Sequence, residues 1–337
     1  MGRPFPLDGV AETTKQRFVV RRNLRGVNAV LPLSVSVREV GPRDGLQIEQ
    51  PIPLSAKLAM LEALAATGVR RIEATSFVSS RAVPALADAD ELAAALGRWP
   101  EIRWSALVAS LRGVERAIAA GVTDLEYVVS AADAHSQANV GRSTAESVEL
   151  IGPIADAVHA AGGQLEVIVA TAWDCPFTGP TDPARTVGVA REALARGADA
   201  LCLGDTIGTT VPGRVLDLIA GVRGLDPAVD VGVHFHNTRG TGLANALAAV
   251  QAGVTSLDSS VGGLGGCPFA PGASGNIATE ELVYLLDGCS VATGIDLEAV
   301  LAAATVTEHA VGHDLPSNLY RAGGRARPLG VAAVAPR

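Results

Sequence analysis

The stretch Asp230-Val-Gly-Val-His-Phe-His-Asn237 decides how the rest of the chain is interpreted. Its apolar and polar residues alternate. In a β-strand, side chains at i and i+2 point to the same face, so His234 and His236 would project together. Two imidazoles about one strand repeat apart can bind a single metal ion from one side. The alternative is a pair of hydrogen-bonded structural histidines, but the chain has only six histidines. The pair therefore predicts a metal site at the end of a strand.

The composition excludes several classes of protein. The chain has 337 residues, of which 48% are hydrophobic and 18% charged, so it can bury a large core. Its net charge of −8 and its pI near 5.3 argue against nucleic-acid binding, because no basic stripe is available to neutralise phosphates. No apolar run approaches the ~18 residues needed to cross a bilayer, so we expect no membrane partner. The four cysteines have neither metal-type nor disulfide-type spacing, which favours a reduced, cytoplasmic protein.

Strands and helices alternate regularly on both sides of this stretch. The predicted strands are Leu33–Val40, Ile72–Phe77, Ile102–Ala109, Asp124–Ser130, Leu165–Thr171, Ala198–Leu203, Val231–His236 and Ser256–Ser260. The predicted helices are Leu54–Ala66, Ala87–Leu96, Arg112–Ala120, Thr144–Ala161, Asp182–Arg196, Pro212–Val222, Gly242–Gln251, Asn276–Leu286 and Asp296–His309.

Eight strand–helix units predict an α/β fold, a single (β/α)8 TIM-type barrel with extra C-terminal helices. An open, doubly wound sheet is the alternative, because periodicity does not distinguish closure. We expect residues 1–32 to form an N-terminal extension, residues 33–320 the catalytic barrel with its C-terminal helices, and residues 321–337 a tail.

Reactive residues follow the carboxyl ends of several predicted strands. Arg43 and Asp44 come after the first strand, Glu73 lies near the end of the second, and Asp205 follows the sixth. Cys267 and Asn276 lie in the loop after the eighth strand, which is rich in glycine. In a closed barrel all these ends meet at one face, where active sites of this fold are built. We therefore expect these groups to converge.

Each of these residues also has a structural interpretation. Asp44 before Gly45 could belong to an ordinary turn, and Asn276 could cap a helix with Glu280 in support. Glu73 and Asp205 could be carboxylates paired with arginine. The glycines after the eighth strand do not match G-x-G-x-x-G in a first βα unit, which argues against a dinucleotide site. A glycine-rich segment carrying one cysteine suits a mobile lid over a polar mouth.

Five motifs together resemble a known family. They are Val-Gly-Pro-Arg43-Asp44-Gly-Leu-Gln47, Glu73-Ala-Thr-Ser76-Phe, Leu-Gly-Asp205-Thr206-Ile-Gly, His234-x-His236, and Gly-Gly263-Leu-Gly265-Gly266-Cys267-Pro followed by Ala-Ser-Gly-Asn276. Over about residues 35–320 the sequence resembles the 3-hydroxy-3-methylglutaryl-CoA lyases. These belong to a wider group of metal-dependent barrel lyases and Claisen-type synthases. The cysteine loop is peculiar to the lyase branch.

The resemblance implies a role for each matching residue. Asp44, His234, His236 and Asn276 would bind a divalent metal, Mg²⁺ or Mn²⁺. Arg43 would stabilise enolate charge on the thioester, Cys267 would move a proton, and Glu73 and Asp205 would support the site. The remaining matches imply substrate contacts for Gln47, Ser76 and Thr206 and a lid containing Gly263, Gly265 and Gly266. The partner would be an acyl-CoA substrate, and the protein a homo-oligomer, dimeric or higher.

The resemblance implies a carbon–carbon lyase that cleaves 3-hydroxy-3-methylglutaryl-CoA, or a close 3-hydroxyacyl-CoA, to acetyl-CoA and a β-keto acid. Asn237, Arg239 and Ile48 depart from the family pattern, which leaves open a longer 3-hydroxy-3-alkylglutaryl-CoA as substrate. A condensing synthase of the same barrel group is a second alternative, disfavoured by the cysteine loop. A non-enzymatic metal-binding scaffold is a third, disfavoured because a scaffold needs neither Arg43 nor Cys267.

Overall fold

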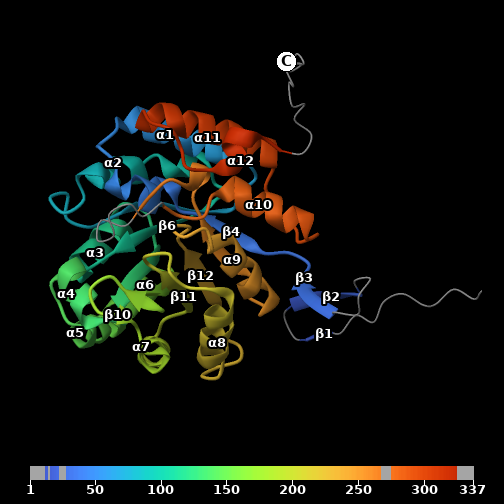
Figure 1. Ribbon diagram of the computed structural model, residues 1–337. Helices are drawn as coiled ribbons and strands as arrows, with labels where there is room; N and C mark the ends of the chain where they lie inside the picture. The colour runs from blue at the N-terminus through green and yellow to red at the C-terminus, as the bar shows by residue number, and fades with distance from the viewer. Residues whose placement is uncertain (1–11, 14–15, 23–27, 267–274, 325–337) are drawn as a thin grey trace, which may run out of the picture.

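Eight parallel strands close into a barrel in this computed structural model, which describes residues 12–13, 16–22, 28–266 and 275–324 (Figure 1). Around the barrel the strand order is β11-β12-β13-β4-β5-β6-β7-β8, and β8 pairs with β11 to close the ring. The strands are β4 Ser36–Glu39, β5 Arg71–Ser76, β6 Arg103–Val108, β7 Asp124–Ser130, β8 Leu165–Ala170, β11 Ala200–Asp205, β12 Val231–Phe235 and β13 Ser256–Ser259. The predicted barrel is thus confirmed, and an open sheet is excluded.

The strands are buried on both faces, as parallel strands covered by helices must be. All six residues of β8 are buried. Leu165, Val167 and Val169 belong to the apolar core between the barrel and its helices. Ile168 and Ala170 instead line a cavity at the barrel mouth. β12 alternates in the same way, with Val231, Val233 and Phe235 in the apolar core.

Helices surround the barrel, as Figure 1 shows. They are α1 Leu54–Ala65, α2 Ala89–Ala93, α3 Leu111–Ala119, α4 Asp133–Val140, α5 Thr144–Glu149, α6 Ile151–Ala160, α7 Pro183–Ala195, α8 Pro212–Arg223, α9 Gly242–Gln251, α10 Thr279–Gly288, α11 Leu297–Val311 and α12 Asn318–Ala322. The C-terminal helix α11 packs against α1, beside the first strand–helix unit. Within the described ranges, no helix has both the length and the apolar composition needed to cross a membrane.

Three helix predictions differ from the structure. The helix predicted over Thr144–Ala161 is divided at Leu150 into α5 and α6. Pro153 explains the division, because it has no N–H for the carbonyl four residues earlier and its ring clashes there. The helix predicted over Ala87–Leu96 is reduced to α2, followed by a separate 3-10 turn, η4 Leu96–Arg98. α10 begins at Thr279 rather than at Asn276, with Ala278 at its N-cap position.

Smaller elements lie outside the barrel. β1 Glu12–Thr13, β2 Gln16–Arg22 and β3 Asn28–Pro32 form an antiparallel sheet, and β3 lies beside α9 (Figure 1). β9 Asp174–Cys175 and β10 Gly179–Pro180 form a short hairpin after β8. Residues 12–32 thus contain strands that the extension prediction did not specify. The boundaries predicted at residues 33 and 320 stay predictions.

Candidate active site

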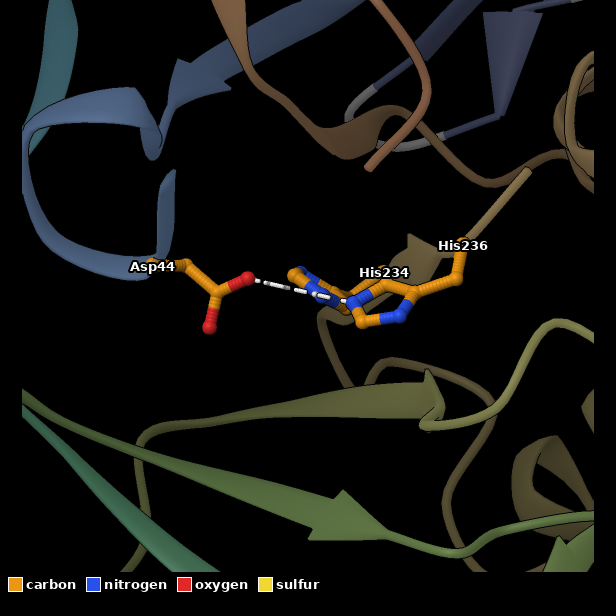
Figure 2. Close-up of side chains that lie close together, drawn as sticks. All are labelled: Asp44, His234 and His236. Carbon is orange, nitrogen blue, oxygen red and sulfur yellow. Dashed lines mark ion pairs between the residues drawn. The ribbon is translucent and has the colours of Figure 1, made fainter. Parts of the chain in front are cut away.

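Asp44, His234 and His236 meet at the carboxyl ends of β4 and β12. One potential ligand atom from each residue lies within 4.8 Å of the other two. The Nε2 atoms of His234 and His236 are 3.9 and 3.8 Å from Asp44 Oδ2, and the ring centroids are 5.2 Å apart. Figure 2 shows the Asp44 carboxylate facing both rings. The predicted same-face projection of the two histidines is therefore present, and a carboxylate from the turn after β4 completes the cluster.

A tight turn after β4 delivers Asp44. Residues Gly41–Gly45 form a single π-helical turn, η1, in which the N–H groups of Arg43, Asp44 and Gly45 all donate to the carbonyl of Val40. Burial alone would raise the pKa of Asp44, but Arg43 and the two histidines lower that pKa well below its usual range. Asp44 is therefore an anion at neutral pH, as a metal ligand must be.

Arg43 is held by two carboxylates. Its Nε lies 2.7 Å from Glu73 Oε1 on β5, and its Nη1 donates to Asp44 Oδ1 at 2.6 Å. Nη1 also lies 3.4 Å from Gln47 Oε1. In the part of the chain that the structure describes, Nη2 has no hydrogen-bond partner. Burial lowers the pKa of Arg43, but the two carboxylates outweigh this and raise it, so the guanidinium stays charged. A fixed cation with a free donor thus stands beside the histidine pair.

Asn276 joins the cluster from the other side of the glycine-rich loop. Its backbone bridges to His236, and its Nδ2 donates to Asp44 Oδ2 at 2.9 Å and to the Leu264 carbonyl at 3.1 Å. Gly265, with φ +123°, lies so close that a Cβ on it would be 2.7 Å from Asn276 Nδ2. A side chain at this position would displace the Asn276 amide from Asp44. This steric conflict explains why a glycine occupies position 265.

The site opens into a cavity of about 760 Å³. Its lining includes eight of the predicted site residues, namely Arg43, Asp44, Gln47, Ser76, Thr206, His234, His236 and Gly266. Arg112, Arg116 and Arg142 also line the cavity and make it basic. Such a volume suits part of a ligand larger than a simple metabolite, with anionic groups toward the arginines.

Two predicted acidic residues lie behind the cavity wall. Glu73 is fully buried against Arg43; burial raises its pKa, and Arg43 only partly offsets this. Asp205 is 1% exposed, and its carboxylate accepts the backbone N–H groups of Thr209 and Thr210. Asp205 therefore shapes the loop after β11, which also carries Thr206. Both carboxylates are placed to hold other groups in position.

The glycine-rich loop is described up to Gly266, so Cys267 lies outside the described residues. Gly263 has a left-handed φ of +69° and follows Gly262, at φ +68°. The buried carboxylate of Glu39 accepts the N–H groups of Gly41 and Val261, and Glu280 accepts that of Gly262. Glu39 thus connects the turn that carries Asp44 to the beginning of this loop. The lid role of Gly263, Gly265 and Gly266 stays a prediction.

Comparisons with known proteins identify the family of this chain. Residues 34–307 match the family described as HMGL-like. The chain belongs to the HMGL-like family. It is 38% identical over 318 residues to a mitochondrial hydroxymethylglutaryl-CoA lyase of Rattus norvegicus, covering 93% of this chain and 98% of that protein. The resemblance predicted from the five motifs is confirmed.

Two further HMGL-like relatives bear on the ligand. An (R)-citramalyl-CoA lyase of Chloroflexus aurantiacus is 41% identical over 301 residues, covering 86% of this chain and 95% of that protein. A solved HMG-CoA lyase of Acinetobacter baumannii, in complex with coenzyme A and 3-methylmalate, is 38% identical. It superimposes with a TM-score of 0.83 over 87% of this chain and 96% of that chain. The chain therefore spans nearly the whole length of these HMGL-like proteins.

The three departures from the family motifs have different surroundings. The Nη1 of Arg239 donates to the carbonyls of Ile207 and Gly208, so this side chain braces the loop after β11. Asn237 Oδ1 accepts the N–H of Gly242 at the beginning of α9. Ile48 is 44% exposed. Neither Arg239 nor Asn237 lines the cavity, so their effect on acyl preference would be indirect.

Sequence reasoning missed several residues beneath and beside the site. Asp258 on β13 accepts a hydrogen bond from His234 Nδ1 at 3.1 Å, and Arg38 on β4 pairs with Asp258. His135 on α4 lines the cavity, with its Nδ1 2.7 Å from Ser130 Oγ. Burial lowers the pKa of His135 to about 4, so its ring is neutral. The sequence did offer a signal for Arg38 and Asp258, since each is a charged residue within a predicted parallel strand. Such strands are buried on both faces, so a charged residue there needs a buried partner.

Proposed function

We propose that this protein is a metal-dependent carbon–carbon lyase that cleaves 3-hydroxy-3-methylglutaryl-CoA, or a close 3-hydroxyacyl-CoA, to acetyl-CoA and the matching keto acid. The observation that carries the proposal is the placement of Asp44, His234 and His236 beside Arg43 on one cavity wall. A metal ion held by these three residues would lie next to the fixed guanidinium. The two together could bind the hydroxy acid and the thioester side by side. That is the arrangement a retro-Claisen cleavage needs.

Asp44, His234, His236 and Asn276 would hold the metal. The carboxylate and the two imidazoles converge to within one coordination sphere, and the described residues contain no other such cluster. This nitrogen and oxygen donor set suits Mn²⁺ and Mg²⁺. Asn276 now presents its amide nitrogen, and a half-turn would exchange it for the oxygen. Two oxygens at this separation repel unless a cation lies between them, so we expect the amide to turn when the metal binds.

When bound, the metal supplies Lewis acidity that lowers the pKa of the substrate hydroxyl and fixes the hydroxy acid. In the cleavage the hydroxyl would give its proton to the Cys267 thiolate, the carbon–carbon bond would break, and the electron pair of that bond would move onto the thioester as an enolate. Arg43 would stabilise that enolate, because Glu73 and Asp44 hold the guanidinium while Nη2 remains available. Cys267 would return a proton from Sγ to the enolate carbon, which gives acetyl-CoA.

The acyl group is the open choice within this proposal. Citramalyl-CoA has one methylene fewer between its hydroxyl-bearing carbon and its carboxylate than 3-hydroxy-3-methylglutaryl-CoA. The same bond cleavage would give pyruvate in place of acetoacetate. The 41% identical citramalyl-CoA lyase makes this shorter substrate a second candidate. Longer 3-hydroxy-3-alkylglutaryl-CoA thioesters are a third, and bond formation by a condensing synthase is a different reaction of the same barrel group.

A substrate panel tests the proposal directly. The purified protein is incubated with Mg²⁺ or Mn²⁺ and each thioester, and products are identified by mass spectrometry. Acetyl-CoA with acetoacetate supports the hydroxymethylglutaryl substrate, and acetyl-CoA with pyruvate supports the citramalyl substrate. Failure to release acetyl-CoA from every 3-hydroxyacyl-CoA, with either metal, would refute the lyase function.

We also propose a cytoplasmic, homo-oligomeric protein. The cysteines Cys175, Cys202 and Cys289 are free thiols, as a reducing compartment favours. Light scattering after size exclusion would test the oligomer, since a single species of the 34.3 kDa chain mass would contradict it.

A further inference from the structure

Arg38 is a buried cation inside the barrel. It lies on β4 directly opposite Asp258 on β13, and only 2% of it is exposed. Its Nε donates to Asp258 Oδ1 and its Nη2 to Asp258 Oδ2, both at 2.8 Å. Two parallel hydrogen bonds between a guanidinium and a carboxylate fix the plane and the rotation of that carboxylate. Arg38 therefore determines how Asp258 is oriented.

Asp258 in turn contacts His234, one of the proposed metal ligands. Its Oδ2, which Arg38 already holds, accepts from His234 Nδ1 at 3.1 Å. A hydrogen on Nδ1 leaves the lone pair of a neutral ring on Nε2, and His234 Nε2 is the atom that faces Asp44. The partner histidine lacks this support, because His236 Nδ1 is buried with no hydrogen-bond partner among the described residues. The series of hydrogen bonds that begins at Arg38 thus reaches His234 but not His236.

Arg38 also meets two other carboxylates. Glu126 Oε1 on β7 and Glu166 Oε1 on β8 each lie 2.7 Å from the guanidinium. A simpler role would be to neutralise these buried acids, and any cation of similar reach could do that. The two roles differ in geometry, because a lysine retains the charge but has no planar pair of donors for Asp258. This difference makes the two roles separable by experiment.

We propose that Arg38 is a positioning residue that fixes the orientation and the metal-facing tautomer of His234 through Asp258. The inference rests on the metal site proposed above. It adds a residue from the interior of the barrel, one layer beneath the cavity, to the determinants of metal affinity. Arg38 itself does not touch the metal or the reacting atoms.

The test is Arg38→Lys with Arg71→Lys as its matched control. Arg71 also lies inside the barrel, bonded to Ser256 and near Glu166, and among the described residues neither of these partners touches His234. The dissociation constant for Mn²⁺ is measured by electron paramagnetic resonance, with thermal unfolding to confirm folding. Replacing an outer partner of a metal ligand typically weakens binding by roughly 10- to 100-fold. We expect about a tenfold loss for Arg38→Lys and little change for Arg71→Lys.

A double variant identifies the route. If Arg38 acts through Asp258, then Arg38→Lys should weaken Mn²⁺ binding no further in an Asp258→Asn background. Wild-type affinity in a folded Arg38→Lys protein would overturn the proposal. So would losses that multiply in the double variant, because Arg38 would then act independently of Asp258.

The tautomer of His234 can be measured in the wild-type protein, independently of metal binding and of whether the variants fold. Nitrogen-15 NMR of the imidazoles, assigned with His234→Gln, should show His234 protonated on Nδ1 and not on Nε2. The opposite tautomer would overturn the inference even if every variant failed to fold. A wild-type protein that binds no Mn²⁺ but shows the expected tautomer would refute the proposed metal function and leave the Arg38–Asp258–His234 connection standing.

Discussion

Arg43→Lys tests the chemical core of the proposed function most sharply. The guanidinium has three nitrogens, of which Nε and Nη1 are engaged by Glu73 and Asp44. This division keeps the third nitrogen, Nη2, fixed in direction. A lysine has one nitrogen on a flexible stem, so it cannot satisfy both carboxylates and still direct a donor at the thioester oxygen. The substitution therefore conserves charge and removes directed donation.

The expected magnitude follows from that loss. Removing one preorganised donor to a developing oxyanion costs about 10²- to 10³-fold in turnover, or roughly 3–4 kcal/mol of activation free energy. Residual attraction from the lysine charge would place the effect near the lower end of this range. The KM for the thioester should change much less, because the enolate charge is absent from the bound substrate and develops only as the carbon–carbon bond breaks.

The assay is release of acetyl-CoA under saturating Mg²⁺, with kcat and KM determined separately. Arg103→Lys is the control, since Arg103 pairs with Asp124 at the opposite end of the barrel and should leave turnover unchanged. Mn²⁺ affinity and thermal unfolding show whether the site and the fold survive. A folded Arg43→Lys enzyme with wild-type kcat would show that a positive charge alone is enough for turnover. It would refute the role assigned to directed hydrogen-bond donation from Nη2.

Three other predictions test separate parts of the site. His236→Gln should weaken Mn²⁺ binding and abolish turnover because it removes a metal ligand, and excess EDTA should abolish wild-type turnover; full activity in EDTA would exclude the metal. Cys267→Ser should retain Mn²⁺ affinity while turnover falls sharply, because a hydroxyl is a much weaker acid than a thiol; wild-type turnover would exclude proton transfer by Cys267. Burial raises the pKa of Glu280 from 4.5 to about 7. Between these pH values the unfolded chain has released this proton while the folded chain still holds it. The free energy of unfolding should therefore fall as pH rises through this range. Glu280→Gln should reduce that fall by up to about 3 kcal/mol in urea denaturation at about pH 5 and about pH 8; an unchanged pH dependence would contradict the raised pKa.

The barrel could be predicted from the sequence because its strands are short, apolar and regularly separated by helices. Val231, Val233 and Phe235 alternate with Gly232 and His234, and that alternation is the one found in β12. Convergence of Arg43, Asp44 and the two histidines followed from barrel closure alone, since every strand then points its carboxyl end to the same face. The roles of these residues remain predictions, but their proximity does not.

Local detail was less accessible from the sequence. α4 has the sequence DAHSQANV, in which polar residues dominate and no apolar period marks a helix. Its importance lies in His135, which it places on the cavity wall. The position of α10 was also shifted, because Asn276 resembles a helix cap but is drawn into the site by its bonds to Asp44 and Leu264. For α10, tertiary contacts at the cavity outweighed the local signal, whereas for α4 the sequence carried no helix signal.

Arg38 shows why the contacts beneath the site could not be predicted from the sequence, although a charged residue inside a strand could be noticed there. In the sequence Ser36-Val-Arg-Glu39, an arginine two residues after a serine is typical of a solvent-exposed strand face. Only closure of the barrel turns that face inward, toward Asp258, Glu126 and Glu166. Burying this many charges is favourable only if they satisfy one another, so the geometry of each is constrained by the rest. A constraint of that kind reaches His234 through a single shared oxygen of Asp258, and so a residue with no access to the cavity can determine how well the cavity holds its metal.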